Sequence, residues 1–164
     1  MRLRTSAEPL GPVPWFPEKG MMEREESELY DTGAVSVDFH LGITGLVFFQ
    51  KPVGVGGKTY ADTNMVHPGF LPQSVNFVVT GVRVESETVS RNVLAFRPLR
   101  AAGSFTFALG SKEVWKYPTD IGMTVVTPVL IPPLQNFFCE LKLSAFIDRR
   151  YRVRLIGQRY RPVQ

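Results

Sequence analysis

Residues 137–147 read Phe-Phe-Cys-Glu-Leu-Lys-Leu-Ser-Ala-Phe-Ile, and this stretch decides the fold class. Every second position is apolar or small, and polar side chains stand between most of them; the apolar set is Phe137, Cys139, Leu141, Leu143, Ala145 and Ile147. Successive side chains of a β-strand point to opposite faces, so alternation over eleven residues predicts a strand with one buried face.

The residues that follow predict a partner for this strand. Asp148, Arg149 and Arg150 are suited to a turn, after which Tyr151, Val153 and Leu155 alternate with Arg152 and Arg154. The two segments together predict an antiparallel hairpin with one apolar and one polar face.

Further short apolar runs precede this hairpin, at Ile43–Phe49, Val75–Glu85, Phe105–Leu109 and Met123–Ile131. In Val75–Glu85 we place Val78, Val82 and Val84 on one face and Phe77 and Val79 on the other, which predicts cover on both sides. Pro128 predicts an edge strand or a bulge. With uneven loops and no internal repeat, the sequence predicts an all-β, antiparallel β-sandwich or barrel, and loops of about ten to twenty residues favour a jelly roll or another Greek-key form over a simple meander.

The N-terminal part differs in composition and predicts an extended Pro-rich arm at 1–34, followed by the jelly-roll domain at 35–164. Residues 9–17 contain four prolines, which exclude a regular helix there. Trp15 and Phe16 are costly to leave in water, so we expect them to dock on the chain's own sandwich or on a neighbouring subunit. For residues 20–31 we expect either one or two helical turns or a solvated acidic loop.

Charge is distributed unevenly along the chain. Residues 1–40 hold eight acidic and four basic side chains, a balance of −4, and residues 41–164 hold seven acidic and fifteen basic, a balance of +8, which together give the net charge of +4. The acidic and basic parts are expected to attract each other, within one chain or between neighbours. The candidate arm contacts are Trp15, Phe16, Glu23, Glu25, Glu26 and Glu28.

The C-terminal strand carries a basic cluster: Arg149, Arg150, Arg152, Arg154, Arg159 and Arg161. Such a stripe is suited to an acidic partner subunit, to anionic lipid headgroups or to a phosphate backbone. It is equally typical of the solvated face of an antiparallel sheet, so the sequence leaves these interpretations open.

Signals for catalysis are weak, and we expect no enzyme, no cofactor and no metal site. His40 and His67 lack metal-ligand partners at short spacing, and the one cysteine, Cys139, is placed on a buried strand face, where a thiol is inert. Residues 54–58, Gly-Val-Gly-Gly-Lys, lack the spacing of a phosphate-binding loop. No segment offers the roughly 18 apolar residues that a membrane-spanning helix needs.

Two stretches carry a resemblance. The first is Asn64–Pro72 leading into Phe77–Val84, and the second is the ending Tyr151–Gln164 with its Leu-x-Gly-x-x-x-Arg-Pro-Val pattern. Covering about a fifth of the chain, they resemble the single jelly-roll capsid proteins of tailless icosahedral phages with an internal membrane, those of thermophilic bacteria above all.

The resemblance implies a structural virion protein, made in the host cytoplasm, that forms homo-oligomers and assembles with other capsid proteins. The surface of the internal membrane is a further partner, and nucleic acid ranks behind these. No small-molecule substrate is expected. The alternatives are a carbohydrate-binding module using Tyr60, Trp115 and Tyr117, and a nucleic-acid-binding barrel using the arginine stripe.

Overall fold

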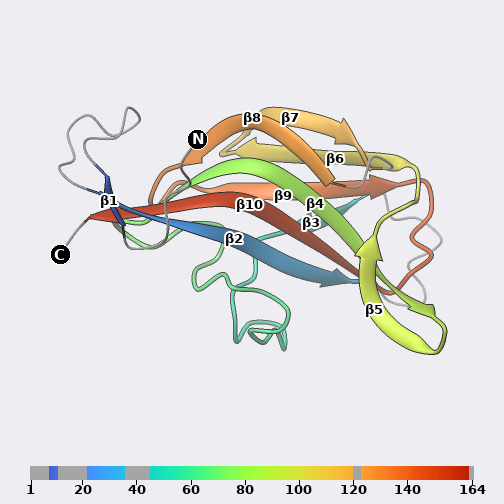
Figure 1. Ribbon diagram of the computed structural model, residues 1–164. Helices are drawn as coiled ribbons and strands as arrows, with labels where there is room; N and C mark the ends of the chain where they lie inside the picture. Colours follow the sequence, from blue (N-terminus) through green and yellow to red (C-terminus); the bar gives the residue numbers. More distant parts are fainter. Residues whose placement is uncertain (1–7, 11–21, 36–44, 120–122, 163–164) are drawn as a thin grey trace.

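The computed structural model describes residues 8–10, 22–35, 45–119 and 123–162 (Figure 1). These ranges form strands and connecting turns without an α-helix, which confirms the expected all-β class. The strands are β1 Glu8–Leu10, β2 Met22–Ala34, β3 Leu46–Phe48, β4 Asn76–Ser90, β5 Val93–Pro98, β6 Gly103–Leu109, β7 Lys112–Pro118, β8 Met123–Ile131, β9 Phe137–Leu143 and β10 Arg150–Pro162.

The strands form two antiparallel sheets, which are the two layers of a sandwich (Figure 1). The larger sheet has the order β1-β2-β10-β4-β5, with β8 also pairing with β4, and the smaller has the order β3-β9-β6-β7. If β1 and β5 are set aside, each strand lies in the opposite sheet from the one before it, except in the β6–β7 hairpin. This alternation is the jelly-roll arrangement of two Greek keys.

The core lies between the two sheets and is built from their inward-facing apolar side chains. Val153 and Leu155 of β10 and Phe107 and Leu141 of the smaller sheet are all 0% exposed. Burying one such side chain contributes about 1.5–3 kcal/mol to folding. Cys139 is likewise buried, as expected. Its burial, and to a smaller extent the negative charge of Asp31, raises the pKa of its thiol well above the usual value.

The predicted hairpin of residues 137–155 is wrong, although both strands exist. Strand β9 lies in the smaller sheet between β3 and β6, whereas β10 lies in the larger sheet between β2 and β4. Both edges of each strand are therefore already paired, and the chain between them crosses from one layer to the other. The alternation also ends early: β9 stops at Leu143, Ile147 is 77% exposed, and Phe146 is buried against the ring edge of Tyr151.

A bulge changes the predicted face assignments in β4. Its register with β10 shifts between Ile156 and Gly157, so Val79 and Val82 both face the core while Val78 faces outward. All three valines are nevertheless buried, so cover on both sides of this strand is confirmed. Strand β8 pairs with β4 and with no other strand among the described residues, as the edge position predicted from Pro128 requires.

The acidic segment is a strand, and the expectation of helical turns or a loop is wrong from Met22 onward. Thirteen residues of β2 pair with β10, from Met22 opposite Pro162 to Ala34 opposite Arg150. The segment that we assigned to an arm at 1–34 therefore supplies a strand of the larger sheet. Trp15 and Phe16 lie outside the described residues.

The segment 51–72, between β3 and β4, covers part of the edge of β2 that lies beyond its pairing with β1. Asn64 accepts a hydrogen bond from the Tyr30 amide through Oδ1 (3.0 Å) and donates one from Nδ2 to the Glu28 carbonyl (2.8 Å). Its side chain thus occupies the place of a neighbouring strand at a point where β2 would otherwise present unpaired backbone groups.

Gly157 provides a test of the bulge between β10 and β4. A Cβ atom at this position would lie 1.9 Å from the carbonyl oxygen of Val78, a backbone atom that cannot move without disturbing the sheet. We expect Gly157→Ala to lower the free energy of unfolding by about 2–3 kcal/mol, as overpacking does elsewhere. Denaturant-induced unfolding followed by circular dichroism measures this change.

Gly33→Ala is the matched control on β2, because a Cβ there meets only the flexible side chain of Leu46. We expect it to cost less than about 1 kcal/mol. Equal losses in the two variants would contradict the close approach at the bulge.

Candidate functional site

Three of the predicted arginines share the outer face of the larger sheet. Arg150, Arg152 and Arg154 alternate along β10 with the buried Tyr151 and Val153. The β-strand period therefore places all three guanidinium groups on the side of the sheet that faces away from the core.

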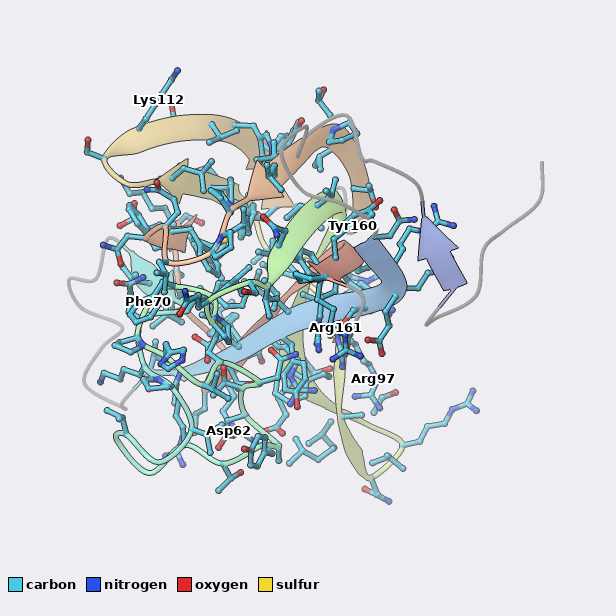
Figure 2. All side chains as sticks on the ribbon, turned by 90° about the vertical axis from the view of Figure 1, so that its left-hand side faces the viewer. Asp62, Phe70, Arg97, Lys112, Tyr160 and Arg161 are labelled. Atoms are coloured by element: carbon cyan, nitrogen blue, oxygen red, sulfur yellow. The ribbon has the colours of Figure 1, made fainter. Side chains whose placement is uncertain are left out.

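Two of these arginines are held by carboxylates from other elements. Arg154 pairs with Glu28 of β2 (2.6 Å) and with Glu85 of β4 (2.8 Å). Arg150 pairs with Asp62 of the 51–72 loop (2.6 Å) and with Glu87 of β4 (3.2 Å); in Figure 2, Asp62 lies on the side of the larger sheet away from Lys112, which belongs to the smaller sheet. The ion pairs thus join β10 to its neighbours on both sides and to the loop.

The third arginine, Arg152, forms no ion pair with another described residue and is held by other contacts. Its guanidinium carbon lies 4.1 Å from the ring centroid of Phe96 on β5 and 5.8 Å from that of Tyr30 on β2. It donates hydrogen bonds to the Thr32 hydroxyl and to the Ala61 carbonyl. The Arg152 side chain is partly withdrawn from water. This burial is the largest cause that lowers its pKa, and the positive charge of Arg154 is the second.

The other three arginines of the predicted basic cluster lie apart from this network. Arg149 is exposed in the turn before β10, Arg159 donates a hydrogen bond to the Ser27 hydroxyl, and Arg161 lies 3.8 Å from Glu25. The structure thus divides the six arginines among separate environments, and the carboxylates that pair with Arg150, Arg154 and Arg161 come from the same chain.

The predicted acidic contacts lie on β2 beside β10. Glu25, Glu26 and Glu28 are opposite Arg159, Gln158 and Ile156 in the register of the two strands. Ion pairs between the acidic and basic parts form within the chain, from Glu28 to Arg154 and from Glu25 to Arg161. The backbone of Glu23 lies opposite Arg161.

A buried carboxylate that the sequence did not reveal lies beneath this face. Asp31 of β2 is 1% exposed, and it accepts hydrogen bonds from the amides of Phe49 (2.6 Å) and Thr32 (3.0 Å) and from Lys58 Nζ (2.5 Å). Burial raises the pKa of Asp31, although these donors oppose the rise. Asp31 thus links β2 to Phe49 at the end of β3 and, through its ion pair with Lys58, to the glycine-rich segment at 54–58.

The aromatic residues proposed for carbohydrate binding do not form one surface. Trp115 of β7 stacks on the buried Phe107 at 4.8 Å and lies 5.4 Å from Tyr117, so both pack against the core. Tyr60 is in the 51–72 loop beside the other sheet, and it is 66% exposed.

Exposed apolar side chains gather at one end of the molecule instead. The β4–β5 hairpin carries Val89, Val93 and Leu94, which are 66%, 57% and 58% exposed, and Ile147 in the turn before β10 is 77% exposed. Figure 1 shows β5 and the end of β4 projecting beyond the two layers, at the end opposite to β1. This surface could not be predicted from the sequence, because the hairpin residues lack a long alternating pattern.

No candidate metal site was found in the described part of the chain. Groups of three or more His, Cys, Asp or Glu side chains placed to hold an ion are absent from residues 8–10, 22–35, 45–119 and 123–162. In the same ranges there is no helix of the length and hydropathy that crossing a bilayer requires. Comparisons of the chain with protein-family models, with curated proteins and with solved structures gave no match.

The buried carboxylate leads to a test of how β2 is held. Removing one partner of a buried ion pair leaves the other charge uncompensated, so we expect Asp31→Ala to lower the free energy of unfolding by about 3–5 kcal/mol. Equilibrium denaturation in urea measures the change.

Asp62→Ala is the control, since Asp62 also forms an ion pair, here with Arg150, but in a more solvated position than that of Asp31. Exposed pairs contribute about 0–1 kcal/mol, so this variant should remain close to the wild type. A loss for Asp31→Ala no larger than that for Asp62→Ala would show that the buried contact does not hold β2.

Proposed function

We propose that this chain is a structural subunit of a virus shell, a non-enzymatic capsid protein of the virion that assembles with copies of itself and with other capsid proteins. The observation that carries the proposal is the strand order: β2-β10-β4-β8 faces β3-β9-β6-β7, and viral capsid domains are among the proteins built on this jelly roll. Fold alone does not define a function, so the surfaces must support it.

The surfaces support assembly better than ligand binding. The arginines of the outer face are balanced by Glu28, Glu85, Glu87 and Asp62, which leaves little free positive charge there for a nucleic acid. Exposed apolar side chains, by contrast, gather on a projecting hairpin, where burial against another protein is favourable. A shell also needs only modest contacts, because each is repeated many times.

The resemblance at Asn64–Pro72, Phe77–Val84 and Tyr151–Gln164 supports the same assignment. The proposal places the protein in the virion after synthesis in the host cytoplasm. Trp15 and Phe16 are assigned to a contact with a neighbouring subunit or with the chain's own sandwich, and the surface of the internal membrane is a further partner.

Light scattering over a range of protein concentrations tests this proposal. We expect the full chain to form species larger than a monomer as concentration rises, and we expect removal of residues 1–21 to weaken them while leaving β2 and the sandwich intact. A strict monomer at every concentration would contradict self-assembly.

The double variant Trp15→Ser and Phe16→Ser is the control for chain length. If the arm aromatics make the contact, this variant should resemble the truncated chain. Multimers as stable as those of the wild type would remove the two aromatics from the interface.

A further inference from the structure

The apolar end of the molecule combines a projection with two hollows. Ile147, 77% exposed, borders both of them. The wider hollow has a volume of about 800 Å³ and is lined partly by Val35 and Leu94, and the narrower has a volume of about 360 Å³ and is lined partly by Pro98 and Leu99. One surface therefore offers both an apolar side chain to insert and a hollow whose wall includes apolar residues to receive one, with charged residues completing the lining of the wider hollow.

The charges at the rim of the wider hollow are also of both signs. Asp148 and Arg149 follow Ile147 directly and line this hollow, and neither side chain takes part in an ion pair with another described residue. The other two charged residues that line this hollow, Glu87 and Arg150, pair with each other. An unpaired acid beside an unpaired base is a surface that complements itself when a two-fold axis turns one copy against another.

The hairpin that forms one wall of the hollow is held in shape. Arg91 and Asn92 have positive φ values of 51° and 62°, which define the type I′ turn that matches the twist of a hairpin. Arg97 donates hydrogen bonds to the carbonyl of Thr88 on the facing strand and to that of Val93 (3.1 Å). A surface ordered before binding loses less conformational entropy when a partner docks on it.

We propose that this end is a two-fold contact between copies of the chain, in which Ile147 of each copy enters the hollow lined by Leu94 and Val35 of the other. Arg149 of each copy then faces Asp148 of its partner. The inference rests on the proposed function, and it goes further by naming the surface, the partner and the symmetry.

Sedimentation equilibrium of the full chain tests the apolar part of the contact. Leu94→Asp places a charge in the hollow, and we expect it to raise the dimer dissociation constant at least tenfold. Leu134→Asp is a matched control, because Leu134 is also a leucine 58% exposed but lies in the turn between β8 and β9. This control should dimerise as the wild type does, and thermal unfolding verifies that both variants fold.

A charge exchange tests the symmetry without disturbing the apolar side chains. Arg149→Glu and Asp148→Arg should each weaken the dimer, since each brings like charges together across the axis. The double variant restores opposite charges and should recover most of the affinity. Such recovery is not expected if the two residues act only on the fold of one chain.

The outcomes separate this inference from the proposed function. If the wild type associates and Leu94→Asp associates equally well, the two-fold contact is wrong while shell assembly through another surface stands. If the wild type is monomeric at every concentration, the two-fold contact is overturned together with the self-assembly on which it rests.

Discussion

The rest of the structure depends on the pairing of β10 with β2 on one side and with β4 on the other. This pairing brings the first and last described long strands of the chain together over thirteen residues of β2. It also fixes both faces of β10, with Val153 and Leu155 in the core and Arg152 and Arg154 turned outward. Because the arginines are close together on one face, the strands beside them must supply carboxylates, and Glu28 and Glu85 do so.

This constraint explains why the acidic and basic parts of the sequence do not remain available as separate surfaces. The acidic residues lie on β2 and the basic residues on β10, and these two strands pair directly. Beneath this contact, Asp31 joins β2 to Lys58. Each exposed ion pair contributes little to the free energy of unfolding. Several ion pairs that bridge three elements nevertheless favour the observed strand register over shifted registers. Several exposed apolar side chains gather at the hairpin end around Leu94 and Ile147, and we assign assembly to this end.

The fold class could be predicted from local alternation, as in Phe137–Leu143, because a half-buried strand carries its period in its own residues. The pairing partners of the strands could not be predicted, because strand pairing is non-local. A hairpin between β9 and β10 was expected, but each of these strands pairs with other strands. Strand β2 was missed since its inward positions include Asp31, whose burial depends on Lys58, far away in sequence. Alternation alone places Arg152 and Arg154 on one face of β10, but their partners on β2, β4 and the loop left no local signal in the sequence.

Amide hydrogen exchange over β2 tests the central claim most directly. If β2 is an integral strand, its amides that face β10 should exchange as slowly as those of β10 itself, because both are released only when the sheet opens. Exchange of those β2 amides at the rate of an exposed loop such as residues 54–57, with β10 still protected, would contradict the account.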